Sequence, residues 1–378
     1  MRQEGFFVIA DLSGYTRLLT QSELEQAQAV VRNLLSTLLE QTRPPLIVSR
    51  LEGDAIFSYA PEGSFLQGQT LHESLENMYC AFRRALEQEE RNTGCDCQAC
   101  SIRPTLDLKV IVHHGQYVVE KVGQTQVLHG ADVIVAHRLL KNSIAESAGI
   151  QAYLFFTESA AKAMALGSLV ETMRLHTETY EHLGEVKGYV CDLHPVWERE
   201  RQKGRILVEP DDDLWFAYEV EVPVPPALAW DYLHMPEKKR QWLQLDGIRV
   251  TSLRKGRVGA GTVHQCVQGR QTWRHFFVDW RPFEYATAEY LLPLRGISRI
   301  TLALTPRESG TRVCVRSAKP QGSRQLQTAI IRGFMAPLRS EIETGWRKGL
   351  LNLREIIEAD IAAGRILTHT EPRRAQAA

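Results

Sequence analysis

The hydrophobic positions in the first half of the chain alternate between strand-like and helix-like spacing. An apolar, β-rich run at residues 5–10 precedes residues 22–41, where Leu, Ala and Val recur every three or four positions. The remaining elements expected in this half are strands within 46–59, at 106–112, 116–122 and 152–157, and helices at 71–90, 132–147 and 159–165. This order predicts an α/β sandwich with a largely antiparallel sheet and helices on one side.

The second half of the chain has a different pattern. Residues 197–204 are mostly polar and form the best candidate linker. After it come strand-like runs at 214–222 and between 248 and 316, a short helix at 225–232, and one long helical stretch at 325–363. We therefore expect an α+β protein with a first domain at 1–200, a second at 201–367 in which a long helix crosses a curved antiparallel sheet, and a disordered tail at 368–378.

Composition narrows the class of protein. The 378 residues carry 45 basic and 45 acidic side chains, so no net charge draws the chain towards nucleic acid or an anionic membrane. No segment has the roughly 18 to 20 consecutive apolar residues of a membrane span, and Asp11 ends a first apolar run too short for a secretory signal. The odd number of cysteines, seven, argues against a disulfide framework, so we expect a cytoplasmic protein.

Two aspartates stand at the ends of strand-like runs in the first domain. Asp11 follows an apolar strand, and Asp54 lies in a predicted turn between two strands. Carboxylates beside backbone carbonyls are hard oxygen ligands that suit Mg²⁺ or Mn²⁺, and two such ions hold phosphates during phosphoryl or nucleotidyl transfer. Each aspartate taken alone could instead cap a turn or a helix.

At these residues the chain resembles the class III nucleotidyl cyclases, the family of adenylate and guanylate cyclases. The resemblance covers about residues 5–194. The matching segments, in order, are residues 7–16, 52–55, 112–119 with Val122-Gly123, 130–139 and, more weakly, 183–188. It implies a ferredoxin-like α/β sandwich in which Asp11, Asp54 and the carbonyl of Ile9 hold two Mg²⁺ or Mn²⁺ ions. It also implies attack of a ribose 3′-oxygen on the α-phosphate of a nucleoside triphosphate, with release of pyrophosphate.

The resemblance assigns further residues to the nucleotide, some of which depart from the family pattern. Arg50 stands where the family has an adenine-selecting Lys, and Val127 stands near the position of an Asp that reads adenine. Ile134 occupies the position of the Asn that orients the ribose, while the transition-state Arg is present as Arg138. Asn142, one helical turn beyond Arg138, is a candidate substitute for the missing Asn. Gly14 and Thr16, in the segment after Asp11, are placed at the nucleotide by the same resemblance.

In the family, two such domains face each other and complete the active site together. One chain carries one domain, so the resemblance implies a homodimer, or a heterodimer with a second cyclase-like chain. The departures at Val127 and Ile134 leave a second interpretation open, in which the domain binds nucleotide or dimerises without catalysis.

Three cysteines crowd into six positions. The spacing of Cys95, Cys97 and Cys100 fits a tight Zn²⁺ or iron–sulfur loop, for which Cys80, His113 or His114 could supply a fourth ligand. A redox-sensing pair and plain reduced thiols are the alternatives, because no second C-x-x-C completes the pattern.

From about residue 211 to 363 the chain resembles the START-like superfamily, whose helix-grip fold includes polyketide cyclases and lipid carriers. The matching features are a strand at 215–222, residues 225–233, 259–262, 279–283 and 309–312, and the long terminal helix. The resemblance implies a cavity for a lipid-like or aromatic ligand, for which Trp230, Trp242, Trp273 and Trp280 are candidate lining residues. Core packing is the alternative role for these rings.

Together these observations predict a cyclase-like enzyme that forms a cyclic nucleotide from a nucleoside triphosphate, regulated by an apolar ligand in the second domain. Two alternatives stay open. One is a catalytically silent nucleotide-binding or dimerisation module, and the other is a lipid or small-molecule carrier.

Overall fold

A computed structural model describes residues 2–92, 98–122, 125–252 and 257–366. The chain forms two compact units, Met1–Lys203 and Gly204–Ala378. Each unit combines a sheet with helices, so the fold class is α+β. The tail expected at 368–378 lies outside the described residues. Within the described residues, no helix has both the length and the apolar content needed to cross a membrane.

The first unit contains an eight-stranded sheet with the order β2-β3-β1-β4-β6-β8-β7, and β5 pairs with β4. The strands are β1 (Arg2–Ser13), β2 (Ile47–Glu52), β3 (Ala55–Pro61), β4 (Asp107–Val122), β5 (Thr125–His129), β6 (Tyr153–Thr157), β7 (Arg174–Tyr180) and β8 (Gly184–Asp192). Strands β4 and β6 run parallel, and β1 lies antiparallel between β3 and β4. This central position explains why the apolar run of β1 is buried on both of its faces.

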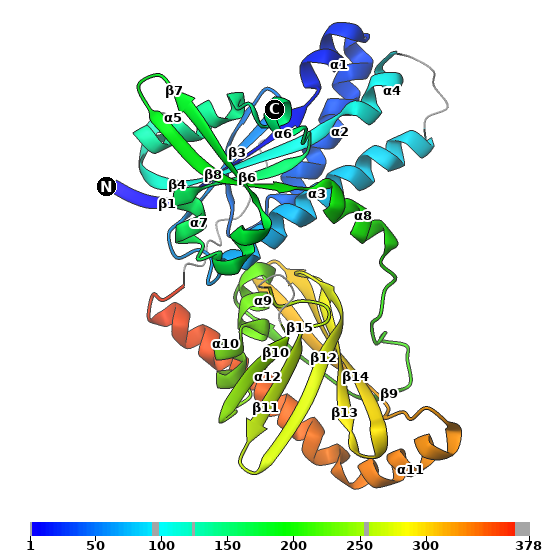
Figure 1. Ribbon diagram of the computed structural model, residues 1–378. Helices are drawn as coiled ribbons and strands as arrows, with labels where there is room; N and C mark the ends of the chain where they lie inside the picture. Colours follow the sequence, from blue (N-terminus) through cyan, green and yellow to red (C-terminus); the bar gives the residue numbers. More distant parts are fainter. Residues whose placement is uncertain (1, 93–97, 123–124, 253–256, 367–378) are drawn as a thin grey trace. The chain divides into compact units, whose positions relative to one another are not determined.

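Helices cover both faces of this sheet. They are α1 (Tyr15–Gln21), α2 (Leu24–Gln41), α3 (Gly68–Asn92), α4 (Gln98–Ile102), α5 (Ala131–Arg138), α6 (Ile144–Ala148), α7 (Glu158–Ala163) and α8 (His194–Gln202). The long helices α2 and α3 pack against each other and share a core with Val8 and Leu12 (Figure 1). On the other face, α5 packs Val133 against Phe7 and Ile9. The expectation of helices on one side only is therefore wrong, because β1 is apolar on both faces.

Several expected element boundaries are wrong as well. The strands expected at 106–112 and 116–122 are one strand, β4, which continues through the intervening His-His-Gly segment because β1 pairs with residues 107–118 of it. The helix expected at 132–147 ends at Arg138 and resumes as α6 after a short 3₁₀ turn, Leu139–Lys141. The linker expected at 197–204 is helical, within α8, as far as Gln202.

The second unit contains a seven-stranded antiparallel sheet with the order β10-β11-β12-β13-β14-β15-β9. Its strands are β9 (Leu214–Val222), β10 (Gly247–Ser252), β11 (Val263–Gln268), β12 (Gln271–Arg281), β13 (Tyr285–Leu292), β14 (Gly296–Arg307) and β15 (Gly310–Ala318). Its helices are α9 (Pro226–His234), α10 (Pro236–Trp242), α11 (Gln325–Met335) and α12 (Arg339–Ala362). The helix expected over 325–363 is interrupted by a 3₁₀ turn at Ala336–Leu338, where Pro337 cannot donate a backbone hydrogen bond.

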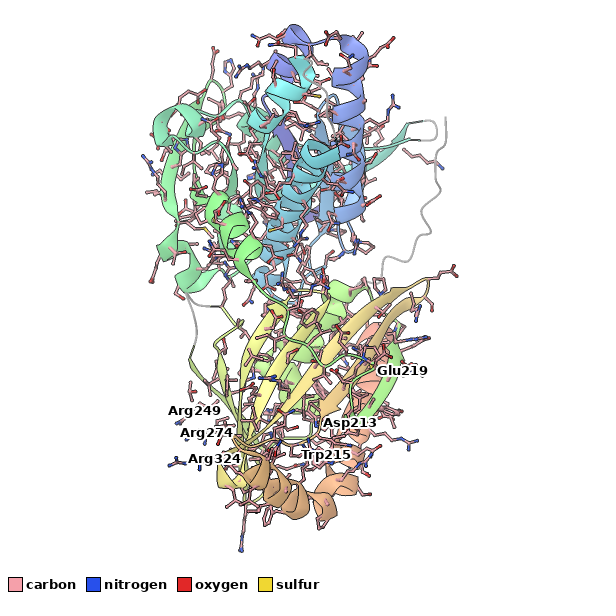
Figure 2. The ribbon with its side chains drawn as sticks, turned by 90° about the vertical axis from the view of Figure 1, so that its right-hand side faces the viewer. Asp213, Trp215, Glu219, Arg249, Arg274 and Arg324 are labelled. Atoms are coloured by element: carbon pink, nitrogen blue, oxygen red, sulfur yellow. The ribbon has the colours of Figure 1, made fainter. Side chains whose placement is uncertain are left out.

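The two faces of this second sheet differ in polarity. Exposed Arg249 and Arg274 are both in register with Gln265, and Figure 2 shows their side chains pointing into solvent. The neighbouring strand positions, His264 and His275, face the opposite side and are fully buried. Because side chains alternate along a strand, this side is the interior face, which α9, α10 and α12 cover (Figure 1).

Candidate functional site

The two predicted metal ligands lie close together at one end of the β1–β3 pair. Asp11, near the carboxyl end of β1, is in register with Ala55, the first residue of β3. Asp54 directly precedes Ala55, in a tight turn whose other residue, Gly53, has a φ of 64° that favours glycine. The hairpin therefore brings Asp54 beside Asp11, as the sequence predicts.

A lysine that the sequence analysis did not select completes this arrangement. Lys109 of β4 is in register with Asp11, and its Nζ lies 2.9 Å from Asp11 Oδ2. The same amine donates a hydrogen bond to the carbonyl of Leu140 at 3.1 Å. In the sequence, Lys109 is marked only by its charge among the apolar residues at 108–112. Its partner, Asp11, follows only from the strand register.

The single ammonium of Lys109 does not fully balance the two carboxylates, Asp11 and Asp54. Partial burial, followed by the nearby charge of Asp11, raises the pKa of Asp54 from 3.8 to about 6, although Lys109 opposes the change. A divalent cation bound beside both carboxylates would offset the negative charge of Asp11 that raises the pKa of Asp54.

The oxygen atoms at this site suit a hard cation, which would bind only a few protein ligands. Asp11 and Asp54 supply carboxylate oxygens, and Ile9 could offer only its backbone carbonyl, because its side chain is a hydrocarbon. Among the described residues, no group of three or more His, Cys, Asp or Glu side chains is arranged to hold a metal. An ion here would therefore keep open positions for water or phosphate oxygens, as Mg²⁺ usually does.

The segment after Asp11 turns into α1. Gly14 has a φ of 89°, a left-handed conformation that favours glycine, and Tyr15 begins the helix. Thr16 is exposed, and its carbonyl accepts a hydrogen bond from the Thr20 hydroxyl at 2.9 Å. The expected nucleotide contacts of Gly14 and Thr16 stay predictions.

Arg50, expected at the base, is held by neighbouring side chains. Its guanidinium donates to Glu52, lies 3.3 Å from His137 Nε2, and sits over the ring of Phe57. His137 in turn lies 3.1 Å from Glu52, and burial lowers its pKa although Glu52 opposes this. A nucleotide base that contacts Arg50 must therefore compete with Glu52. Val127, on β5, is half-buried and has no polar side-chain atom to offer.

The end of α5 places Arg138 and Asn142 differently from expectation. Arg138 is exposed, one turn after Ile134, whose side chain is 55% exposed. Asn142 lies beyond the end of α5, so the expectation that it shares the helix face of Arg138 is wrong. Its amide instead donates to the Leu139 carbonyl, while its Oδ1 accepts from the backbone of Ile144 and the hydroxyl of Tyr153. Three hydrogen bonds of this side chain hold the turn.

The His-His-Gly segment of β4 anchors the start of α5. A Cβ on Gly115 would lie 2.4 Å or less from the side chain of Asp132, so only glycine permits this approach. Asp132 accepts a hydrogen bond from the backbone of Gln116 at 2.7 Å, and His113 Nδ1 lies 3.0 Å from the Thr157 hydroxyl. His114 is paired with Glu62 at 2.6 Å. The contacts of Gly115 and Gln116 with Asp132 therefore position α5.

The cysteine cluster falls largely outside the described residues, which omit Cys95 and Cys97. Cys100 is half-buried in α4. Cys80 lies on α3 and is buried in the core, and burial raises the pKa of its thiol to about 12. The expected zinc site stays a prediction.

The tryptophans of the second unit divide into two groups. Trp230 and Trp280 contact each other edge to face, with centroids 4.8 Å apart, and both contact the ring of His234. Trp242 is fully buried and donates to the Tyr232 carbonyl at 3.0 Å, as a core residue does, while Trp273 is half-buried on β12. Trp230 and Trp280 lie beside His234, whose two ring nitrogens have no hydrogen-bond partner among the described residues. These two tryptophans are therefore the better candidates for contact with a ligand.

Comparison with known proteins gives limited matches. Residues 31–149 match a family described as a protein of unknown function, DUF2652. An uncharacterized protein of Mycobacterium tuberculosis (strain ATCC 25618 / H37Rv), Rv2561/Rv2562, is 32% identical over 146 residues. That match covers 39% of this chain and 66% of the relative, just under two thirds of its length.

The chain is also similar to solved structures, at low identity. The guanylyl cyclase Cya2 is 18% identical with a TM-score of 0.41, over 50% of this chain and 92% of that one. The adenylyl cyclase CyaB from P. aeruginosa is 16% identical with a TM-score of 0.38, over 51% and 95% respectively. Protein MLL2253 from Mesorhizobium loti is 16% identical with a TM-score of 0.29, over 38% and 96%. These scores are too low to establish a shared function.

Proposed function

We propose that the first unit binds a nucleoside triphosphate through a divalent cation held by Asp11 and Asp54, and that it forms a cyclic nucleotide. The observation that carries this proposal is the carboxylate pair, in which burial and the charge of Asp11 raise the pKa of Asp54 to about 6. Bound Mg²⁺ or Mn²⁺ would neutralise this pair and polarise phosphate oxygens. The chain's own contribution is to hold two carboxylates at one end of a rigid strand pair.

The proposed reaction breaks a phosphoanhydride bond and forms a phosphate ester bond. The ribose 3′-oxygen forms a bond to the α-phosphorus, the bond from that phosphorus to the bridging oxygen breaks, and pyrophosphate leaves with the bonding electrons. The 3′-hydroxyl proton passes to solvent. Lys109, already 2.9 Å from Asp11, is placed to balance negative charge at the carboxylate pair or on a phosphate.

Arg138 is the proposed transition-state residue, acting on a nucleotide held by a second copy of the chain. Its guanidinium is exposed and, among the described residues, forms no side-chain hydrogen bond or ion pair. Ile134, one turn away, adds an exposed apolar side chain. An unpaired cation beside exposed apolar surface suits a face that a second copy covers.

One observation favours a catalytically silent nucleotide-binding module as the second candidate. Ile134 stands where the ribose-orienting Asn is expected, and Asn142, the only candidate substitute we identified, is used in the turn after α5. The same metal-dependent binding would then occur without chemistry.

The test is incubation of the full chain with ATP, GTP, CTP or UTP and Mn²⁺, with products identified by mass spectrometry. We expect one cyclic monophosphate and pyrophosphate, a loss of at least roughly 100-fold in Asp54→Asn, and a loss of about 10² to 10³ in Arg138→Ala with triphosphate binding retained. Lys141→Ala, an exposed cation just beyond Arg138, is the matched control and should keep its rate. Binding without product supports the silent module, and no metal-dependent binding contradicts both candidates.

For the second unit we propose binding of a small, largely apolar ligand between the sheet and its helices. The rings of Trp230, Phe277 and Trp280 converge there, with centroid separations of 4.8 and 4.9 Å. A ligand in contact with these rings should change tryptophan fluorescence, and a Trp280→Phe variant should reduce that change.

A further inference from the structure

Four basic side chains lie together in the interior of the second unit. His264 and His275 face each other across β11 and β12, while His234 ends α9 and Lys239 belongs to α10. Each is at most 1% exposed. We call these four residues the interior basic cluster. Fully buried lysine is rare, and three buried imidazoles beside it need a physical explanation.

The cluster has more hydrogen-bonding capacity than the described residues use. Lys239 Nζ lies 3.0 Å from His275 Nε2. Both ring nitrogens of His234, both of His264, and Nδ1 of His275 have no hydrogen-bond partner in the described ranges of the chain. Buried polar atoms without a partner are costly and rare, so five in one place indicate a polar occupant.

Among the described residues the cluster also has no counter-ion, because no ion pair joins Lys239 to a carboxylate. The ionisable groups around the cluster are Cys266 and Tyr290. Burial lowers the pKa of all three histidines, so they stay neutral, and it lowers that of Lys239 to about 8, which leaves a mostly charged ammonium at pH 7. Water could satisfy the imidazoles, but it brings no negative charge to the ammonium.

Aromatic rings surround the same site. Lys239 Nζ lies 5.4 Å from the centroid of the Phe277 ring, and the His234 ring lies 4.3 Å from that of Trp230 and 4.7 Å from that of Trp280. Tyr290 stacks on His275 at 4.5 Å. An occupant that satisfies both the ammonium and the surrounding rings combines one anionic group with a flat apolar body.

We propose that the interior basic cluster binds the carboxylate of a small aromatic acid, with Lys239 as the charge partner and neutral imidazoles as hydrogen-bond partners. The aromatic body lies against Trp230, Phe277 and Trp280. This inference rests on the proposed ligand-binding function of the second unit and adds the chemical class of the ligand.

The test is titration of the full chain with benzoate, trans-cinnamate and 2-naphthoate, each beside its neutral primary amide, followed by tryptophan fluorescence and calorimetry. We expect at least one acid to bind more tightly than its amide, and Lys239→Met to weaken that acid roughly 10- to 100-fold while changing amide binding less than about threefold. Lys348→Met, an exposed lysine on α12, is the matched control and should bind like the unmodified chain. Acid binding should also weaken above about pH 8, as the amine of Lys239 loses its proton.

Other results overturn the inference. Equal binding of acid and amide, or acid binding unchanged by Lys239→Met, removes the charge partner while leaving ligand binding by the second unit intact. If no acid and no amide binds, both this inference and that proposed function fail, and water is the occupant. Lys239→Gln replaces Lys239→Met if circular dichroism shows that the methionine variant does not fold.

Discussion

At the scale of single residues, the candidate metal site depends on three side chains from three neighbouring strands or turns. Asp11 and Asp54 bring two negative charges together, and Lys109 balances one of them. The ammonium therefore already neutralises part of the charge that a divalent cation would neutralise. Cation binding and the Lys109–Asp11 ion pair are thus expected to be coupled.

The coupling between the carboxylates can be measured directly. We predict that carbon-13 NMR gives Asp54 a pKa near 6, and that Asp11→Asn lowers it, because one of its two causes is the charge of Asp11. The folded state then binds the Asp54 proton more tightly than the unfolded chain, so this group's contribution to the free energy of unfolding falls as pH rises from about 4 to 6. Glu4→Gln, at the other end of β1, is the control, and an unchanged Asp54 pKa in Asp11→Asn contradicts the coupling.

Lys239 gives the opposite dependence on pH. Because burial lowers its pKa from 10.5 to about 8, the unfolded chain binds this proton more tightly than the folded one. We predict that the free energy of unfolding rises from pH 8 to 10.5, by on the order of 3 kcal/mol, relative to Lys239→Met. Urea denaturation of both proteins across this range checks the prediction, and parallel pH profiles contradict it. Cys266, His234, His264 and His275 are present in both proteins, so their own titration largely cancels.

The sequence identifies some of these residues and not others, for a physical reason. Asp11 and Asp54 each follow or join a recognisable apolar strand, so their positions at a strand end and a turn could be predicted from the pattern. Their meeting depends on the pairing of β1 with β3, and only the family resemblance implied it. Lys109 and Lys239 look like ordinary cations in the sequence. Their importance comes from strand register and from helix packing, which the hydrophobic pattern does not specify.

At the scale of elements, one carboxylate joins the three interior-facing helices of the second unit. Asp360 of α12 accepts hydrogen bonds from Tyr232 of α9 and, at 2.7 Å, from Lys238 of α10, and also from Arg365. Burial disfavours the charged carboxylate, but these three donors outweigh it and lower the pKa of Asp360 to about 2. The helix layer that covers the interior basic cluster thus depends on this contact.

We predict that Asp360→Asn lowers the free energy of unfolding by about 3 kcal/mol near neutral pH, because it leaves Lys238 without its charge partner. The difference from the unmodified chain should shrink as pH falls towards 2, since the stabilising charge is present above about pH 4 and lost below. Thermal unfolding at pH 2, 4 and 7 is the measurement. Glu358→Gln, on the exposed side of α12, is the control, and equal effects of the two substitutions contradict the account.

A substitution of Asn142 tests whether its side chain stabilises the turn after α5. We predict that Asn142→Ala lowers the free energy of unfolding by about 1 to 2 kcal/mol, because the carbonyl of Leu139 and the hydroxyl of Tyr153 each lose a partner. Asn33→Ala, an exposed residue on α2, should have a smaller effect in the same urea titration. A variant with normal stability but no nucleotide turnover would instead show that Asn142 takes part in catalysis.

Element boundaries illustrate what periodicity alone misses. The helical pattern continues through residues 139–142 and Pro337, yet the α-helix is interrupted at both places. The Asn142 side chain hydrogen-bonds the surrounding backbone and Pro337 lacks a backbone donor, and these local features override the apolar spacing. The opposite error occurs at His113 to Gly115, where polar residues and a glycine suggest a loop. Pairing with β1 keeps that segment in one strand.

At the scale of the whole molecule, two units with separate cores carry two chemically different candidate sites. The first has paired carboxylates that need a cation, and the second has an interior ammonium that needs an anion. We expect each site to respond to its own ligand class. Substitutions at Asp54 should leave aromatic-acid binding by the second unit unchanged, and substitutions at Lys239 should leave Mn²⁺ binding unchanged.

The central claim is that Asp11 and Asp54 hold a divalent cation. Its most direct test is titration of the full chain with Mn²⁺ at pH 7.5, with and without a nucleoside triphosphate, by calorimetry and electron paramagnetic resonance. We predict saturable binding that the triphosphate strengthens and that Asp54→Asn and Asp11→Asn each weaken at least about tenfold, while Glu4→Gln does not change it. Mn²⁺ binding that is equally strong in all four proteins, or absent from the unmodified chain, contradicts the claim.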